Sequence, residues 1–208
     1  MFLLVEHRAG ATALVPLELF RSAHFCGAVA ATAFMTFGIY GMIFLLPLAW
    51  QTSGLLQSGG AGLALLPCAL VFFIVSPWSG PLAARYGVRL MTAGGTALIA
   101  AGLLVIAGTQ SGRPLIAAEC GLALTGVGMG LNTGPLMSVA VDAVAAARSG
   151  TATALINVAR MTGVTLGVAV LGSIFAFWDG TPDGLRAAMI SGGVVQLGGA
   201  VVAWFTIR

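Results

Sequence analysis

The sequence predicts an all-α membrane protein with six transmembrane helices. Only 7% of the residues are charged and 59% are hydrophobic, whereas about a quarter of a soluble domain is charged. Residues 22–84 contain no Asp, Glu, Lys or Arg. Because a helix crosses the hydrocarbon core with about 20 apolar residues, this stretch alone has room for two crossings. Strands exposed to lipid would leave backbone groups unpaired, so the crossings are expected to be helices.

Turn-forming residues separate the apolar segments in order along the chain. Gly59-Gly60 lies at the turn into the second helix, Gly87 at the turn into the third, and the Ser-Gly-Arg-Pro run 111–114 at the turn into the fourth. Asp142 and Arg148 flank the turn into the fifth helix, and residues 179–184, rich in Asp, Gly and Pro, precede the sixth. The expected helices span 24–49, 58–79, 90–109, 114–138, 149–177 and 186–207. Residues 1–23 are expected to be the end of a preceding helix and a cytoplasmic approach to this bundle.

Several of the predicted helices contain proline or closely spaced glycines. Four prolines lie inside or near the spans: Pro47, Pro67, Pro77 and Pro135. Each removes a backbone donor, so neighbouring helices or a cavity must satisfy the freed carbonyl. In the fourth segment Gly126, Gly130 and Gly134 recur every fourth residue, with Gly128 between them. This ridge of small residues lets another helix approach closely, either as simple packing or as a sliding or gating contact.

The arginines predict how the helices are oriented. With the N-terminus placed in the cytoplasm, six arginines face that side: Arg8, Arg21, Arg85, Arg89, Arg148 and Arg208. Only Arg113 and Arg186 face outward. This distribution follows the positive-inside rule and predicts a cytoplasmic N-terminus.

Composition and motifs argue against several classes of function. The nine basic residues are all arginine and are scattered singly, so no basic run resembles a nucleic-acid-binding groove. The two histidines lie at the N-terminal side, and no nucleophile is paired with a base inside a span, so no enzyme is expected. Three cysteines sit in apolar runs without a C-x-x-C motif: Cys26, Cys68 and Cys120. They are expected to be free packing thiols, and no metal site or cofactor is expected.

Four groups of residues carry a resemblance to a known family. They are Glu6-His7-Arg8 with Pro16-Leu17-Glu18-Leu19-Phe20-Arg21 and Phe25; Pro47-Leu48, Gln51 and Gly62-Leu63-Ala64-Leu65-Leu66-Pro67; Ser76-Pro77, Gly80, Leu82-Ala83, Arg85, Gly87 and Arg89; and Gly150, Ala152, Ile156-Asn157, Arg160, Gly163, Gly167 and Ala169. Together they resemble the C-terminal half of a major facilitator, in particular the fourteen-span drug:proton antiporters of the EmrB/QacA type. The resemblance covers nearly the whole chain but says little about the substrate.

The resemblance implies a function and its partners. The six helices would form the C-terminal bundle of a major facilitator fold in a bacterial cytoplasmic membrane. Two such bundles rock about a midplane site and export drugs or other lipophilic molecules, powered by proton entry. The expected partners are the lipid bilayer, protons, a lipophilic substrate, and either a missing N-terminal half or a second copy. The alternative is a non-transporting remnant or partner protein that assembles with another carrier half, because its motifs would look the same.

A gating loop is also implied by the resemblance. It comprises Gly80, Arg85, Gly87 and Arg89, between the second and third helices. The family usually carries an acid where this chain has Ala84. Its absence removes a carboxylate partner for Arg85 and for the nearby helix N-terminus.

Arg160 is the charge of greatest interest because it is expected near the middle of the membrane. It lies about 18 Å along a helix from Arg148, and an arginine at that depth must be paired or wetted. Glu119, at a similar depth on the preceding helix, is the candidate partner, although a carboxylate reaching the surface beside Arg113 is an equal alternative. Asn157 lies one turn from Arg160 and could hydrogen-bond a substrate or the ion pair. For Arg160 itself a structural latch is the first interpretation, and direct coupling to substrate or protons is the alternative.

The remaining polar and small residues have two interpretations each. Asn132 and Thr125 share one face of the fourth segment and are expected to hydrogen-bond between helices, with a substrate contact as the alternative. The family pattern places Gln51 beside the pathway and Gly163 and Gly167 in helix packing. The tryptophans at segment ends, Trp50 and Trp178, fit an interfacial aromatic belt better than a ligand site.

Overall fold

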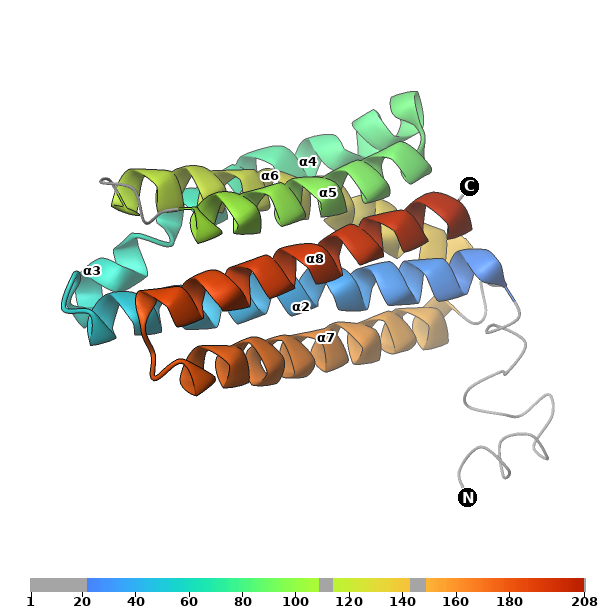
Figure 1. Cartoon of the computed structure of the whole chain (residues 1–208). Helices are drawn as coiled ribbons and strands as arrows, with labels where there is room; N and C mark the ends of the chain where they lie inside the picture. The colour runs from blue at the N-terminus through green and yellow to red at the C-terminus, as the bar shows by residue number, and fades with distance from the viewer. Residues whose placement is uncertain (1–21, 109–113, 143–148, 208) are drawn as a thin grey trace, which may run out of the picture.

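The computed structural model describes residues 22–108, 114–142 and 149–207, and this part of the chain is helical throughout with short connections. Six of its helical segments are long and apolar enough to cross a membrane, which confirms the all-α membrane fold (Figure 1). The helices are α2 (Ala23–Thr52), α3 (Ser58–Leu63), α4 (Leu66–Tyr86), α5 (Val88–Ala107), α6 (Pro114–Asp142), α7 (Ser149–Phe177) and α8 (Pro182–Thr206). Of the expected approach 1–23, residues 1–21 lie outside the described residues.

The second segment differs most from its expected course. Instead of one helix over 58–79, the short α3 ends at Leu63 and α4 begins at Leu66. Pro67 lies in the first turn of α4, where its missing N–H breaks no helical bond. At the other end α4 continues to Tyr86, and Gly87 ends it with a φ of +88°, a conformation that only glycine adopts readily.

The last helix starts earlier than expected. Thr181 caps α8, and its hydroxyl accepts a hydrogen bond of 3.4 Å from the Gly184 amide. Pro182 follows as the first helical residue, a position that proline favours. The capping therefore sets the start of α8 at Pro182, ahead of the expected 186.

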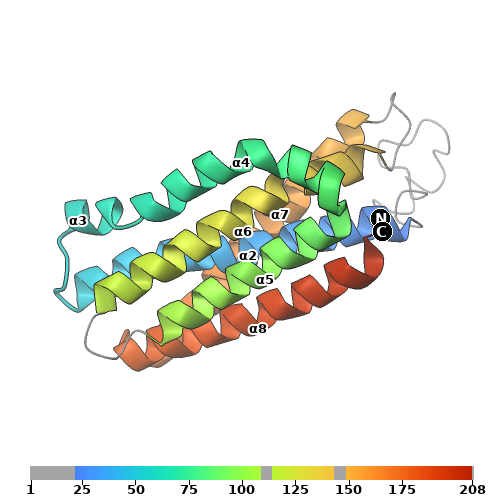
Figure 2. The ribbon, with the colours of Figure 1, turned by 90° about the horizontal axis from the view of Figure 1, so that it is seen from above.

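The helices form an open arc. The main contacts join α4 to α6, α6 to α5, α5 to α8, α8 to α2, and α2 to α7, and the arrangement is visible from two sides (Figures 1 and 2). A smaller contact between α2 and α6 closes the middle of the arc. Helices α4 and α7 thus stand at its two edges, and each has one principal neighbour.

Glycines make the contacts at both edges close. A Cβ atom at Gly126 would lie 2.5 Å from the Cys68 carbonyl oxygen of α4, and one at Gly134 would lie 2.6 Å from the Ser79 hydroxyl. The predicted ridge, with Gly130 facing Val75 between these positions, therefore lies in the α6–α4 contact. Gly128, between them, instead faces α5.

The α7 edge uses the same device. A Cβ at Gly163 would overlap the Ala33 carbonyl oxygen, and one at Gly167 would overlap the Phe37 carbonyl oxygen, both on α2. Because these obstacles are backbone atoms, neither side can move aside without shifting a helix. Gly163 and Gly167 thus lie in the α7–α2 contact.

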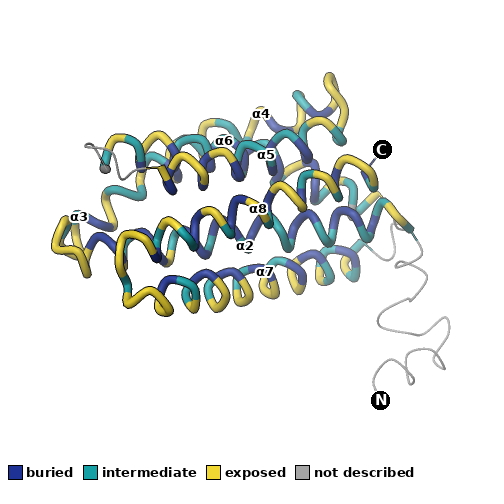
Figure 3. Tube along the Cα trace, in the orientation of Figure 1, coloured by how far each residue is buried: buried dark blue, intermediate teal, exposed yellow. Residues whose placement is uncertain are grey.

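The two edges are the least covered parts of the bundle (Figure 3). Buried residues make up 11% of the most apolar stretch of the second span and 28% of that of α7, against 56% in α2. The exposed residues differ between the edges. Both edges expose large apolar side chains, such as Leu70 and Phe73 on α4 and Val158 and Met161 on α7. The exposed polar side chains of α4 lie at its C-terminal end, at Arg85 and Tyr86, whereas α7 exposes Asn157, Thr162 and Thr165 along its length.

Candidate functional site

Three polar side chains are interspersed with apolar ones on the exposed side of α7. Asn157, Thr162 and Thr165 are exposed there and, together with Val158, Met161 and Leu166, line a shallow depression. We call these six residues the α7 polar face. They follow one another at alternating spacings of one and three residues, which places them on one side of the helix. Every lining residue belongs to α7, so this surface forms one wall of a site rather than an enclosed pocket.

Arg160 lies beside this face and is half-buried. Its carbonyl oxygen accepts a hydrogen bond of 3.1 Å from the Thr36 hydroxyl, which ties α7 to α2. Its side-chain Nε is buried without a hydrogen-bond partner, and none of the described carboxylates pairs with the guanidinium. Burying an arginine in an apolar helix costs free energy unless a partner or water compensates its charge. Because the described residues provide no such partner, the guanidinium of Arg160 is available to a group outside these helices.

The expected ion pair between Glu119 and Arg160 is not formed. Glu119 is exposed near the start of α6, and it has no ion pair among the described residues. Matching the depth of two residues does not make their helices neighbours. Here α6 packs mainly on α4 and α5, while α7 packs mainly on α2. The alternative partner, Arg113, lies outside the described residues.

Asn132 lies inside the bundle rather than on an open face. It is fully buried, and its amide is hydrogen-bonded to the Thr96 hydroxyl of α5 at 3.0 Å in either orientation of the amide. Thr125, on the same helix, lies 3.7 Å from Cys68 Sγ of α4 and 3.9 Å from Met42 Sδ of α2. Both side chains therefore join helices, as the interhelical interpretation predicts.

The gating-loop arginines contact aromatic rings. The Arg85 guanidinium is 5.4 Å from the centre of the Tyr86 ring, and that of Arg89 is 4.1 Å from the centre of the Trp204 ring on α8. No described carboxylate pairs with either arginine, in keeping with the missing acid at Ala84. Gly80 is exposed on α4, and a Cβ added there would have nothing within 4 Å.

Gln51 lies far from the α7 polar face. It is exposed near the end of α2, and its side-chain oxygen accepts a hydrogen bond of 3.0 Å from the Ser58 hydroxyl. This bond joins the end of α2 to the start of α3.

Sequence reasoning missed Gln196. This residue of α8 is fully buried, and its Nε2 donates to the carbonyl oxygens of Phe34 and Met35 at 2.7 and 3.1 Å. The side chain passes over Gly38, where a Cβ would collide with it. The available signal was a lone amide in an apolar span, which is expected to find a partner on another helix.

Trp50 was also misjudged. Only 5% of it is exposed, so it is part of the interior and not of an interfacial belt. Trp178, by contrast, is 48% exposed and fits the belt interpretation.

The chain belongs to the major facilitator superfamily, because the model of that family matches residues 4–168. It is a multi-pass bacterial membrane protein. It is 33% identical over 178 residues to the multidrug resistance protein Stp of Mycobacterium tuberculosis, covering 86% of this chain and 33% of that protein. It is also 32% identical over 176 residues to a probable actinorhodin transporter of Streptomyces coelicolor, covering 82% of this chain and 30% of the relative.

A further relative is the multidrug efflux pump LfrA of Mycolicibacterium smegmatis. It is 28% identical over 194 residues, covering 91% of this chain and 38% of the pump. The chain therefore spans about a third of the length of these relatives.

Proposed function

We propose that this chain supplies one six-helix wall of a transporter that exports drugs or other lipophilic small molecules. A second six-helix bundle, from a separate polypeptide, the same polypeptide or another copy, would supply the opposite wall. The two bundles would rock about a site at the membrane midplane. The N-terminal side of this bundle is placed in the cytoplasm, on the distribution of arginines.

The main support for this proposal is that the bundle leaves two helices, α4 and α7, uncovered on one side. Helices α4 and α7 each pack on one principal neighbour, while the other four spans are covered more fully. Asn157 and Arg160 lie at the α7 edge, far from either end of that helix. Polar groups at such depth are expected to face protein or a water-filled path instead of lipid.

The chemistry of the site follows from these groups. Arg160 would hold an anionic group of the partner bundle or a proton-carrying carboxylate, and Asn157 with Thr165 would hydrogen-bond polar atoms of the substrate. The apolar residues between them, such as Met161 and Leu166, would contact its lipophilic body. Glu119, the exposed carboxylate of α6, is the candidate proton carrier within the described residues.

The test is transport of several dyes and antibiotics in an efflux-deficient bacterial host. The chain is expressed alone and joined to the coding sequence that lies upstream of it, with matched amounts in the membrane. We expect resistance and dye export only when a second bundle is present, and their loss on Arg160→Ala. If neither form exports any compound while both insert, the chain is a non-transporting partner protein and the proposal fails.

A further inference from the structure

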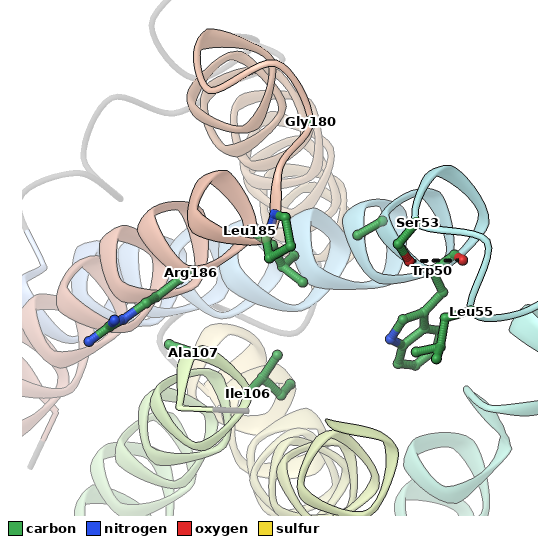
Figure 4. A pocket seen from close by; sticks show the side chains of 10 residues that line it. Trp50, Ser53, Leu55, Ile106, Ala107, Gly180, Leu185 and Arg186 are labelled. Carbon is green, nitrogen blue, oxygen red and sulfur yellow. Dashed lines mark hydrogen bonds between the residues drawn. The ribbon is translucent and has the colours of Figure 1, made fainter. Parts of the chain in front are cut away.

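A cavity lies at the end of the bundle where α7 turns into α8 (Figure 4). Its volume is about 370 Å³, within the range of small-molecule sites. The ends of α2 and α5 and the start of α8 enclose it. The residues that matter for its chemistry are Trp50, Ser53, Leu55, Ile106, Leu185 and Arg186.

This cavity is separate from the α7 polar face. Its walls come from α2, α5 and α8, which are successive members of the inner part of the arc, whereas the polar face lies on the outward side of α7. No residue lines both. The proposed transport function therefore leaves the cavity unassigned, and the inference below does not depend on that function.

The walls are mostly apolar. Leu185 and Ile106 stand between the two ends of the cavity, and Trp50 and Leu55 stand together at one end (Figure 4). The Ser53 hydroxyl donates to the Trp50 carbonyl oxygen at 3.2 Å, so its proton is already engaged. An apolar body lying against a tryptophan ring suits these surfaces.

Among the described residues that line the cavity, Arg186 is the charged one. Figure 4 shows its side chain passing the end of α5 beside Ala107, on the side away from Trp50. It is exposed, and the described residues give its guanidinium neither an ion pair nor a hydrogen bond. Asp179 and Asp183 precede it in the sequence but do not line the cavity. Arginine presents a fork of donors that matches a carboxylate or sulfonate.

We propose that this cavity binds a singly charged anionic amphiphile of medium chain length. Its carboxylate or sulfonate would bind Arg186, and its apolar chain would run past Leu185 and Ile106 to Trp50. The arrangement selects for a molecule with one acidic end and one apolar end, because the cationic rim and the tryptophan lie at opposite ends of the cavity.

Quenching of tryptophan fluorescence by bromine tests this directly, because bromine quenches only on contact. The full chain is placed in nanodiscs of zwitterionic lipid, with Trp50 as its one tryptophan after Trp78→Phe, Trp178→Phe and Trp204→Phe. The probes are 11-bromoundecanoate, the uncharged 11-bromoundecanol, and the trimethylammonium analogue of the same length. We expect saturable quenching by the carboxylate, with an affinity about fivefold above that of the alcohol, as for an accessible charge pair.

Substitutions at Arg186 and Ala107 distinguish binding of the probe's charged group from binding of its apolar tail. Arg186→Gln should remove the preference for the carboxylate, Arg186→Lys should retain most of it, and Arg85→Gln, at the other end of the bundle, should change nothing. Ala107→Phe should fill the cavity and abolish saturable quenching by all three probes. Circular dichroism checks that each variant keeps its helices. Quenching that does not saturate, an equal or higher affinity for the cation, or full binding in Arg186→Gln would overturn the proposal.

Discussion

The two edges of the arc are built alike but present different surfaces. Both α4 and α7 approach their neighbours through glycines, Gly126 on one side and Gly163 on the other. Outside these contacts both helices show large apolar side chains, and α7 adds Asn157 and Thr165. The same packing device thus supports one apolar edge and one edge that also carries polar groups. On this difference the proposed function assigns the transport site to α7.

Removing the charge at the polar edge should have the largest effect. In the complete transporter, Arg160→Ala should reduce export about thirtyfold or more, because truncating one member of a buried charge interaction costs about 2–5 kcal/mol. Export of a fluorescent dye from loaded cells measures this, with membrane insertion checked by immunoblot. Val194→Ala, at an exposed position of α8 outside the proposed site, is the control. Export at the normal rate in Arg160→Ala would remove this arginine from the mechanism.

Breaking the glycine contacts should destabilise both edges. Gly163→Leu should lower the free energy of unfolding by about 1–3 kcal/mol, the usual cost of overpacking, because the new side chain meets the α2 backbone. Gly126→Leu should do the same at the α4 edge. Denaturant unfolding in detergent provides the measurement, and Gly198→Leu, where nothing lies within 4 Å of a Cβ, is the control. Equal stability of Gly163→Leu and Gly198→Leu would show that the close α7–α2 contact does not exist.

Exchanging hydroxyl for methyl should distinguish the two edges more finely. Thr165→Val keeps the shape of the side chain but loses its hydroxyl, so export of a hydrogen-bonding substrate should fall about threefold, equivalent to about 0.7 kcal/mol. Ile74→Val on the exposed side of α4 should leave export unchanged. Export rates over a range of substrate concentrations provide the measurement, and a larger loss in Ile74→Val than in Thr165→Val would reverse the assignment of the edges.

A similarly small effect is expected away from the edges, where α5 meets α8. Trp204→Leu removes the ring under Arg89 and should reduce the unfolding free energy by about 0.5–1 kcal/mol. Thermal unfolding of the detergent-solubilised chain, compared with Trp178→Leu as an exposed tryptophan, measures it. A stability loss shared equally by the two variants would mean that the Arg89–Trp204 contact contributes nothing of its own.

The sequence predicted the fold well because the bilayer imposes strong constraints. Long runs free of charge fix which segments cross, and Gly87 and Pro182 mark two turns between them. The glycine ridge on α6 was also recognisable, since its spacing of four residues places it on one face. The first residues of α4 and α8 were harder to predict, because they depend on Pro67 in the first turn of α4 and on the cap that Thr181 provides to α8.

The site was harder to predict because it depends on which helices are neighbours. Depth along the membrane made Glu119 a plausible partner for Arg160, but depth does not say that α6 packs mainly on α4 and α5 while α7 packs mainly on α2. Asn132 was expected to bond to another helix, with a substrate contact as the alternative, and only its contact with Thr96 identifies which helix it joins. Trp50 sits at a helix end, where aromatic residues usually face the interface, yet it is only 5% exposed and Leu55 lies beside it (Figure 4).

The difference between the edges can be tested most directly by thiol labelling of the assembled transporter. After Cys26, Cys68 and Cys120 are replaced by alanine, a single cysteine is introduced by Thr165→Cys or Leu70→Cys and treated with a charged, water-soluble thiol reagent. The account predicts rapid labelling at position 165, slowed by a transported substrate, and little labelling at position 70. Equal labelling at both positions, or faster labelling at position 70, would contradict it.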